Sequence, residues 1–497
     1  MVAALQFGAL HRSGDELLQR ATRLAGGLRQ LGLREGDAVA VLLRNCEQFV
    51  DIVHACRLAG IYYCPINWHF TPAEVAFLLQ DSGARALIAH GDLLDTNAGV
   101  LPDGLTVLAL GETRRPDAIA YETWLAQSPA YDGPEVAPRG HLAYTSGTTG
   151  KPKGVVRLPI PLANLAQQQA RIQRVVEATF GIYPGCRALL PAPLYHSAPG
   201  VFIQNGLLHA ELLVLMARFE PEAVLAAVAR HRIDVLYLVP IMFVRLLRLP
   251  EAVRRQYDLT SLRFIGSTGA PCAPDVKRAM IEWLGPVVYE TYASSEAGMI
   301  TMIDSQQALT HPGSAGRSVE DAIIRILGED GQPCPPLTPG LIYVRQPAYP
   351  DFTYRGNPAA RQAVERDGLI CLGDIGYLDA EGYLFVCDRA SDMVISGGVN
   401  IYPAEIEHEL GRYPGVADCA VFGVPDAEYG ERLHAVVEAA PGETLEPQAM
   451  IDWLKSQLSG FKVPRAIELA PLPRDDNGKI AKRKLRDAHW AGQSRRV

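Results

Sequence analysis

The sequence predicts an α/β protein with a large N-terminal domain of parallel sheets layered with helices, a small β-barrel-like subdomain, and a small mobile C-terminal α+β domain. Three observations lead to this prediction. Helical and strand patterns alternate over the first half of the chain, short strand patterns fill residues 315–388, and a second alternation begins near residue 391. Strands that alternate with helices form parallel sheets covered on both faces. A chain of 497 residues is also too long for one core.

The first alternation follows from apolar spacing and from the glycines that end helices. Apolar residues recur at helical spacing from Asp15 to Leu31, and Gly32 follows. A buried strand pattern comes next at residues 39–43. In the same way we expect helices at 47–58, 73–80 and 220–231, and strands at 61–65, 86–89, 235–239 and 264–265.

The second half of the chain has a different pattern of predicted elements. Between residues 315 and 388, short alternating segments are separated by Gly, Asp and Pro, which is typical of a small antiparallel or barrel-like unit. After residue 391 the expected elements are a helix at 405–410, strands at 418–423 and 434–438, and a helix at 451–458. We therefore expect an N-terminal domain at 1–389 and a C-terminal domain at 390–497, with a solvated chain end beyond Leu485.

Composition excludes several classes of protein. The net charge of −8 argues against a nucleic-acid-binding protein. The nine cysteines are scattered without a C-x-x-C pair, which is typical of reduced thiols in the cytoplasm. We find no signal peptide and no transmembrane segment. Self-association into a homodimer is left open.

The most informative stretch is the run from Tyr144 to Gly154, which reads YTSGTTGKPKG. Its glycines let backbone N–H groups approach an anion, and its hydroxyls and lysines add donors and positive charge, so the run suits a polyphosphate. It is not a Walker A loop, because two residues separate Gly147 from Gly150 and Pro152 follows Lys151. A polar run of this kind is often a flexible surface loop, but the two lysines that frame Pro152 make it more specific.

This run resembles the phosphate loop of the adenylate-forming superfamily, which includes acyl-CoA synthetases, luciferases and peptide-synthetase adenylation domains. The resemblance extends from the first helix to Leu485, with further motifs in the family's order. It implies that ATP is bound by the loop residues Thr145, Ser146, Gly147, Thr148, Thr149, Gly150, Lys151 and Lys153.

Two further motifs resemble the family's nucleotide site. Gly266-Ser-Thr-Gly-Ala-Pro271 resembles the loop along adenine, which implies that Gly269, Ala270 and Pro271 border the nucleotide. The run from Tyr292 to Glu296 resembles the pattern Tyr-Gly-x-Thr-Glu, with alanine at 293 and serine at 295 instead. The resemblance implies that Tyr292 stacks on adenine, Ser295 donates to the α-phosphate, and Glu296 binds Mg²⁺ through oxygen.

The C-terminal motifs complete the set. By resemblance, Asp374 accepts from the ribose hydroxyls, Arg389 lies near the ribose and the hinge, and Ser391 replaces the usual hinge Asp or Lys. Gly397 and Gly398 are expected to line the tunnel for the pantetheine arm of coenzyme A. Lys479, in Gly-Lys-Ile, is expected to reach the substrate carboxylate and the α-phosphate as a point charge.

The favoured function is an ATP-dependent acyl-CoA synthetase. The catalytic set implied by the resemblance is Lys479, Thr145, Ser295 and His196, the last as the aromatic gate between acyl pocket and thiol tunnel. The expected ligands are ATP, Mg²⁺, coenzyme A and a small carboxylic acid that is apolar: fatty, aryl or polycyclic. The alternative is a stand-alone adenylation enzyme that loads a carrier protein. Amino-acid activation is disfavoured, because Ser197 stands where such relatives carry an aspartate.

Overall fold

The computed structural model describes residues 2–145, 152–397, 399–426, 428–474 and 480–490. Packing divides the chain into two compact units. Unit 1 comprises Met1–Ile323 and Val344–Ile370, and unit 2 comprises Ile324–Tyr343 and Cys371–Val497. The expected division after residue 389 concerns which part of the chain moves, and it stays a prediction.

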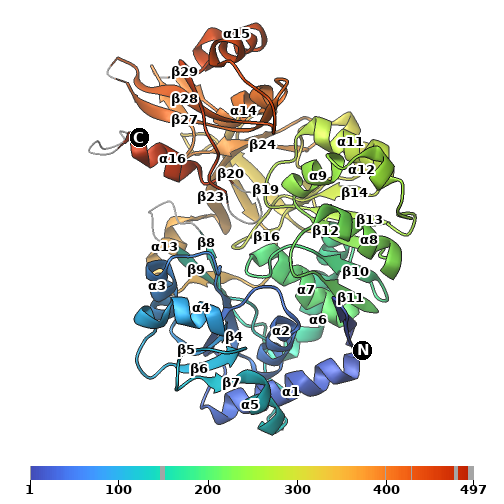
Figure 1. Cartoon of the computed structure of the whole chain (residues 1–497). Helices are drawn as coiled ribbons and strands as arrows, with labels where there is room; N and C mark the ends of the chain where they lie inside the picture. Colours follow the sequence, from blue (N-terminus) through green and yellow to red (C-terminus); the bar gives the residue numbers. More distant parts are fainter. Residues whose placement is uncertain (1, 146–151, 398, 427, 475–479, 491–497) are drawn as a thin grey trace. The chain divides into compact units, whose positions relative to one another are not determined.

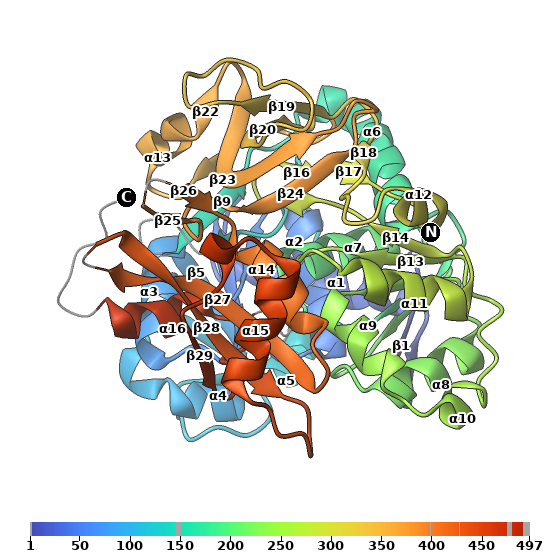
Figure 2. The ribbon, with the colours of Figure 1, turned by 90° about the horizontal axis from the view of Figure 1, so that it is seen from above.

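The first sheet of unit 1 has the strand order β14-β13-β12-β10-β11-β1-β2, and its strands are parallel except for β2. The strands are β1 (Ala4–Phe7), β2 (Leu10–Arg12), β10 (Arg187–Leu190), β11 (Leu212–Leu215), β12 (Val235–Leu238), β13 (Phe264–Ser267) and β14 (Val288–Glu290). The accompanying helices are α6 (Leu162–Phe180), α7 (Ser197–His209), α8 (Pro221–His231), α9 (Pro240–Leu247), α10 (Glu251–Arg254), α11 (Pro274–Leu284) and α12 (Ser305–Thr310). Figure 2 shows α9 and α11 side by side next to β13 and β14.

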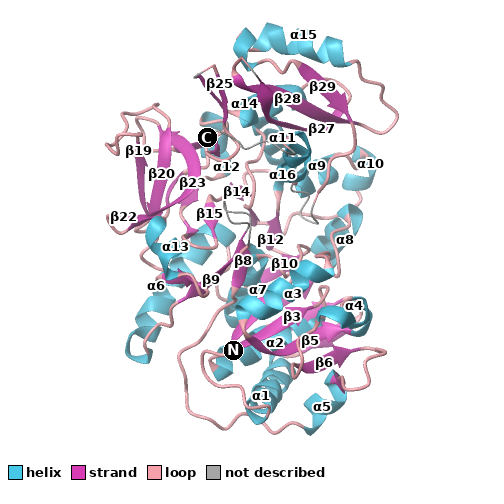
Figure 3. Ribbon diagram, turned by 90° about the vertical axis from the view of Figure 1, so that its left-hand side faces the viewer, coloured by secondary structure: helices cyan, strands magenta, loops and turns pink. Residues whose placement is uncertain are grey.

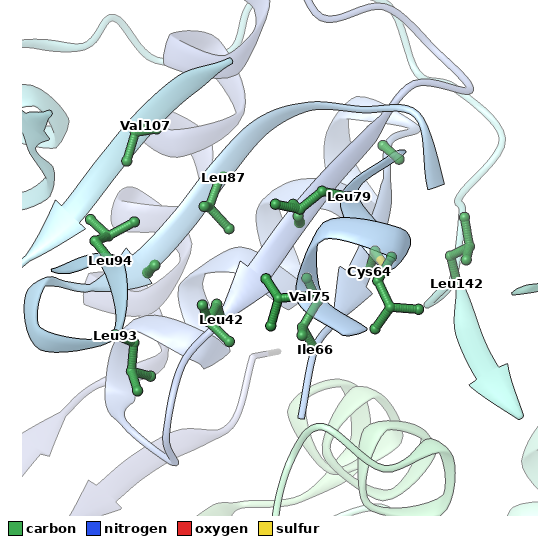
Figure 4. Packing of buried hydrophobic residues seen from close by; sticks show 14 of the residues in the cluster. Leu42, Cys64, Ile66, Val75, Leu79, Leu87, Leu93, Leu94, Val107 and Leu142 are labelled. Carbon is green, nitrogen blue, oxygen red and sulfur yellow. The ribbon is translucent and has the colours of Figure 1, made fainter. Parts of the chain in front are cut away.

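The second sheet of unit 1 is parallel, with the order β4-β3-β5-β6-β7. Its strands are β3 (Ala38–Leu42), β4 (Tyr62–Pro65), β5 (Ala84–His90), β6 (Thr106–Leu110) and β7 (Ile119–Ala120). Its helices are α1 (Gly14–Gln30), α2 (Glu47–Ala59), α3 (Pro72–Ser82), α4 (Gly91–Thr96), α5 (Tyr121–Gln127) and the short 3₁₀ turn η1 (Ala98–Val100). Figure 4 shows Val75 and Leu79 of α3 and Leu93 of α4 packed over Leu42 and Leu87 of the sheet.

Local sequence signals account for the helix ends. Ser13 caps α1 and Thr71 caps α3, each in a capping box with a glutamate three residues later. Gly60 and Gly83 end α2 and α3 in the left-handed conformation. The predicted parallel α/β architecture of the first half is thus confirmed, with element bounds shifted by a residue or two.

Smaller strands complete unit 1. The antiparallel set β21-β9-β8 contains β8 (Ala143–Thr145), β9 (Lys153–Arg157) and β21 (Phe352–Tyr354). Two short antiparallel pairs are β15 (Ala293–Ser294) with β16 (Gly298–Met299), and β17 (Thr301–Met302) with β18 (Arg317–Ser318). Helix α13 (Pro358–Ala363) and strand β22 (Glu365–Arg366) follow β21.

Unit 2 contains a sheet of short strands, as predicted for residues 315–388. The sheet has the order β19-β20-β23-β22, and β24 pairs antiparallel with β23. Besides β22, its strands are β19 (Ile323–Leu327), β20 (Gly340–Arg345), β23 (Leu369–Leu378) and β24 (Leu384–Arg389). Figure 3 shows β19, β20 and β23 side by side.

The second sheet of unit 2 has the order β26-β25-β28-β27, with β29 parallel to β28. Helices cover both of its faces: the core under α14 and α15 includes Ile406 and Leu454, and α16 contributes Leu485 to the opposite face (Figure 1). The strands are β25 (Val394–Ser396), β26 (Val399–Ile401), β27 (Val416–Asp426), β28 (Gly430–Ala439) and β29 (Ala466–Leu469). The helices are α14 (Pro403–Gly411), α15 (Pro447–Gln457), α16 (Lys482–His489) and the 3₁₀ turn η2 (Gly460–Lys462).

The predicted solvated chain end after Leu485 is wrong as far as residue 490. Helix α16 continues to His489, and the indole Nε1 of Trp490 donates to the carbonyl oxygen of Gly423 at 2.9 Å. Leu485 of this helix packs on the sheet, a contact that the many charged residues of the tail conceal in the sequence. Within the described ranges of the chain, no helix is both long and apolar enough to cross a membrane.

Candidate active site

Glu296 lies in the tight turn between β15 and β16. The two strands pair through Ala293 with Met299 and Ser294 with Gly298, and Ser294 Oγ accepts from the amide of Ala297 at 2.8 Å. Glu296 itself is 7% exposed. The motif predicted to bind metal is therefore a short, internally bonded hairpin rather than a solvated acidic turn.

A second motif, from far away in the sequence, reaches the Glu296 carboxylate. Thr145 ends β8 directly before the predicted phosphate loop, and its Oγ1 donates to Glu296 Oε1 at 3.2 Å. The Tyr354 hydroxyl donates to the same oxygen at 3.1 Å. Burial, followed by the charge of Glu296, raises the pKa of Tyr354, so this hydroxyl stays a donor. Lys153, at the start of β9, lies over the Tyr354 ring with Nζ 5.2 Å from its centroid.

Arg157 holds the backbone of the turn that carries Glu296, the predicted metal ligand. It sits at the end of β9, where its Nη2 donates to the carbonyl oxygens of Ser295 at 2.8 Å and Glu296 at 3.0 Å. Its Nη1 donates to Pro350 at 3.0 Å, and its guanidinium lies 5.0 Å from the Tyr349 ring centroid. Arg157 thereby fixes the turn that carries Glu296 relative to the hairpin that carries Thr145.

Arg157→Met is expected to lower the free energy of unfolding by about 3 kcal/mol or more, because buried carbonyl oxygens lose a charged donor. Urea unfolding monitored by circular dichroism measures this change. Arg171→Met is the matched control: its guanidinium pairs with Asp321 at the surface, so a loss below about 1 kcal/mol is expected. Equal losses in the two variants would contradict the anchoring role of Arg157.

Three predicted site segments follow the carboxyl ends of parallel strands in the first sheet. His196 follows β10, the loop with Gly269, Ala270 and Pro271 follows β13, and Tyr292 follows β14. Carboxyl ends of parallel strands share one edge of a sheet, where open α/β sheets bind their ligands. Two of the segments are directly joined, because Thr268 Oγ1 donates to the Thr291 carbonyl at 2.9 Å and the Thr291 amide donates to the Ser267 carbonyl at 2.9 Å.

The loop after β13 rests on a buried ion pair. Lys277 Nζ lies 2.5 Å from Glu290 Oε2, and both side chains are almost fully buried. Gly269 adopts φ +94°, a conformation that disfavours any side chain. The loop residues 269–271 are exposed. The arrangement presents exposed backbone on a rigid support, as expected for a surface along which a flat ring could lie.

His196 precedes α7, and its ring centroid lies 4.4 Å from that of Tyr195. The next residue, Ser197, contacts a histidine that the sequence did not single out: His141 Nε2 lies 2.7 Å from Ser197 Oγ. Burial lowers the pKa of the His141 imidazole from 6.5 to about 4. His141 is therefore neutral at pH 7, and the start of α7 faces an uncharged polar group.

The protein is expected to lose about 1–3 kcal/mol of stability as the pH falls from about 6.5 to about 4, through His141. A histidine whose folded pKa is depressed stabilises the folded state above its unfolded pKa, and this contribution disappears as the pH falls through the folded value. Burial lowers the pKa of His54 to about 4 as well, so His141→Gln should flatten part of the dependence only. Denaturant titrations at several pH values measure it. An unchanged slope in His141→Gln would contradict the assignment.

In unit 2, Asp374 and Arg389 face each other across β23 and β24. They are paired in register, and Arg389 Nε lies 3.3 Å from Asp374 Oδ1. Asp374 is 8% exposed, whereas Arg389 is exposed. The structure thus brings together two residues that the sequence assigned separately to the ribose.

Two other predicted site residues of unit 2 make backbone hydrogen bonds. The carbonyl oxygen of Ser391, the predicted hinge, accepts from Arg486 Nη1 at 2.9 Å. Gly397 adopts φ +58°, and its amide donates to the Tyr429 carbonyl at 2.9 Å. The remaining predicted residues lie outside the described ones: Ser146, Gly147, Thr148, Thr149, Gly150, Lys151, Gly398 and Lys479.

The oxygen atoms at Glu296 are suitable ligands for a magnesium ion. Thr145 and Tyr354 both donate to Oε1. This pattern fixes the carboxylate and leaves Oε2 as a hard oxygen ligand, the type that Mg²⁺ prefers. Glu296, with the adjacent hydroxyl of Thr145, would therefore hold the ion through oxygen alone.

Comparison with known proteins decides the family. The family model of AMP-binding enzymes matches residues 2–350, and that of the AMP-binding enzyme C-terminal domain matches residues 405–479. This chain belongs to the adenylate-forming superfamily. The predicted α/β fold is confirmed, and the CoA ligases among the relatives confirm the predicted class of AMP-forming acid–CoA ligase.

Relatives of this adenylate-forming enzyme extend over nearly its whole length. It is 35% identical over 491 residues to a feruloyl-CoA synthase from an Amycolatopsis species, covering 97% of this chain and 95% of the relative. It is 31% identical over 500 residues to the fatty acid–[acyl-carrier-protein] ligase ScoC of Streptomyces coeruleorubidus, covering 97% and 92%. The crystal structure of ATP-bound MatB from Rhodopseudomonas palustris is 29% identical, with a TM-score of 0.84 and coverage of 98% and 95%.

Sequence reasoning missed the residues that hold this enzyme's motifs in place. Arg157, Tyr354 and His141 belong to no recognisable motif. Only Arg157 carried a signal, since it lies in the apolar strand pattern directly after the phosphate loop, where a buried arginine must find acceptors.

Proposed function

We propose that this enzyme is an ATP-dependent acyl-CoA synthetase. It activates an apolar carboxylic acid as an acyl-adenylate and then forms a coenzyme A thioester. The observation that supports this proposal best is the 3.2 Å contact between Thr145, at the entrance of the phosphate loop, and Glu296 of the metal-binding motif. A phosphate loop and a carboxylate that meet in this way can hold a magnesium–nucleotide complex.

The reaction divides into two displacements. In the first, a carboxylate oxygen of the acid attacks the α-phosphorus of ATP, and the bond to the pyrophosphate breaks. In the second, the thiolate of coenzyme A attacks the acyl carbon, and AMP leaves. Mg²⁺, when bound, neutralises charge on the phosphates. Glu296 binds that ion, Ser295 and Thr145 donate to phosphate oxygens, and Lys479 supplies positive charge at the reacting groups.

The residues proposed to recognise adenosine are those of the family's motifs. Tyr292 and the exposed loop of Gly269, Ala270 and Pro271 offer a stacking surface for adenine. Asp374 accepts from the ribose hydroxyls, and its pairing with Arg389 orients the carboxylate for this task.

Among fatty, aryl and polycyclic acids we favour an aryl acid. The first turn of α7 offers Ser197 beside the neutral His141, so a ring with a hydroxyl or ether substituent would find polar partners without a full charge. Gly200 lies close to the same group, since a Cβ there would stand 3.3 Å from the Tyr63 hydroxyl and 3.7 Å from His141 Nδ1. The 35% identity to a feruloyl-CoA synthase agrees with this preference.

A carrier protein as acceptor is the second candidate, favoured by the similarity to the ligase ScoC. The two candidates share the first displacement and differ in the second. Pyrophosphate release with a panel of hydroxycinnamic, benzoic and fatty acids tests the first. Adding either coenzyme A or an acyl carrier protein to the preformed acyl-adenylate then identifies the acceptor. Release of pyrophosphate with none of the acids would contradict the proposed function.

Ser391→Pro is expected to slow thioester formation about tenfold or more and to spare adenylate formation. Proline locks φ near −65° and restricts the preceding residue, so a hinge that changes its dihedral angles would be held in one state. Single-turnover assays of each half-reaction measure the effect. A folded variant in which both halves run at parental rates would place the hinge elsewhere, and with it the proposed division between residues 1–389 and 390–497.

His196 as the aromatic gate, and Gly397 and Gly398 as the tunnel for pantetheine, belong to the same proposal. A cytoplasmic location and a homodimer stay predictions.

A further inference from the structure

Two histidines and a glutamate meet on the face of unit 2 that α16 covers. His434 lies on β28, Glu468 on the parallel strand β29, and His489 ends α16. The register pairs Val436 with Glu468, and side chains two residues apart share a face, so His434 and Glu468 point to the same side of the sheet. His489 follows Leu485 by one helical turn, and Leu485 packs on that side.

The ligand atoms of these three side chains lie within 4.8 Å of one another. His434 Nε2 and Glu468 Oε2 lie 3.6 Å apart, longer than a hydrogen bond. Zinc bonds of about 2.0–2.1 Å in a tetrahedron place ligand atoms roughly 3.3 Å apart. His434 is 8% exposed, whereas Glu468 and His489 are exposed, so the two outer side chains can close the remaining distance by changing rotamer.

His434, the buried residue of the three, is available as a metal ligand. Its Nε2 is buried and has no hydrogen-bond partner among the residues that the structure describes. Phe422 packs against both rings, with centroid distances of 5.5 Å to His434 and 5.7 Å to His489, and restricts their orientation.

We propose that His434, Glu468 and His489 form a binding site for a transition-metal ion, with Zn²⁺ as the best-fitting ion. Two imidazole nitrogens and one carboxylate oxygen suit zinc and are poor ligands for Mg²⁺ or Ca²⁺. The site uses none of the residues assigned to ATP, the acid or coenzyme A.

The bound ion would fasten the last turn of α16 to the sheet. The first turn is already held, because Lys482 Nζ lies 2.8 Å from Glu407 Oε1. Further along the helix, Arg486 Nη1 donates to the Ser391 carbonyl. Since α16 begins three residues after Lys479 in the sequence, an ion at its far end would stabilise the element that follows the lysine. The ion would thus have a structural role, because it would join α16 to the sheet of unit 2.

The test uses the full chain, stripped of metal with a chelator and titrated with Zn²⁺ by calorimetry without nucleotide. One site per chain is expected. His489→Ala and Glu468→Gln change exposed side chains, and each should weaken binding by at least about 100-fold, because loss of a direct ligand exceeds the roughly 10–100-fold effect of an outer partner. The exposed His408 of α14 supplies the matched control, since His408→Ala removes an imidazole from the same unit without touching the site.

Two further measurements distinguish this site from other metal-binding groups of the chain. Co²⁺ in place of Zn²⁺ should give ligand-field bands without thiolate charge transfer, and Glu296→Gln should bind Zn²⁺ as the parent does. Zn²⁺ should also raise the melting temperature of the parent and not that of His489→Ala. Unchanged binding in both ligand variants, loss of binding in Glu296→Gln, or a thiolate spectrum would each overturn the proposal.

Discussion

Glu296→Gln is expected to lower the rate of adenylate formation by about 10²–10³-fold, a loss typical of removing one electrostatic contact made in the transition state. Glutamine keeps the size of the side chain and an oxygen that can accept from Thr145 and Tyr354. It removes the negative charge that would hold Mg²⁺ against the phosphates. The variant should therefore fold normally and bind the acid while failing at the first displacement. Pyrophosphate release under saturating ATP and acid measures the change.

Tyr354→Phe is the matched control for this prediction. It removes one of the two hydroxyls that donate to Glu296 Oε1 and leaves the charge in place. A net hydrogen bond is worth about 1 kcal/mol, so the rate should fall only about fivefold. Raising the Mg²⁺ concentration should partly restore Tyr354→Phe and leave Glu296→Gln slow. If Glu296→Gln ran at the parental rate, the carboxylate would be a structural group and not a metal ligand.

The fold could be predicted from local signals because they agree with one another. Capping boxes at Ser13 and Thr71, glycines at helix ends, and uninterrupted apolar strands such as 38–42 all point to parallel α/β layers. The chain end was mispredicted for the opposite reason, because its structure depends on contacts between residues far apart in the sequence. Helix α16 is rich in cations, and its stability comes from packing and from the contact of Trp490 with Gly423, which no short-range pattern reveals.

The site could be predicted only as far as its motifs extend. Glu296 and Thr145 stood out because their neighbours form recognisable runs, but their contact joins residues 151 positions apart. Arg157 and Tyr354 act through side-chain bonds to those runs, and neither belongs to a motif of its own. His141 meets Ser197 across 56 positions. Such contacts depend on the three-dimensional arrangement of the strands and loops, which cannot be deduced from a single sequence.

Removing the lysine of the last motif should affect one half-reaction far more than the other. Lys479→Ala is expected to slow adenylate formation by about 10²-fold or more and to leave thioester formation from supplied acyl-adenylate nearly unchanged. In the proposed mechanism its ammonium contacts the carboxylate and the α-phosphate only in the first displacement, where negative charge gathers on both. The second displacement begins from an uncharged acyl carbon, and the thiol of coenzyme A approaches it without this lysine.

Single-turnover assays of the two half-reactions separate these outcomes. Lys484→Ala provides the matched control, because Lys484 is an exposed lysine five residues further along the same basic tail. Both halves should run at parental rates in that variant, which shows that a general loss of positive charge from the tail has no effect. Lys479→Arg should recover little, since a planar guanidinium cannot replace a compact point charge that serves two groups at once. Equal losses in both half-reactions of Lys479→Ala would mean that the residue supports the fold of the C-terminal domain or the grip on AMP, and the charge at the first transition state would have to come from Lys151 or Lys153.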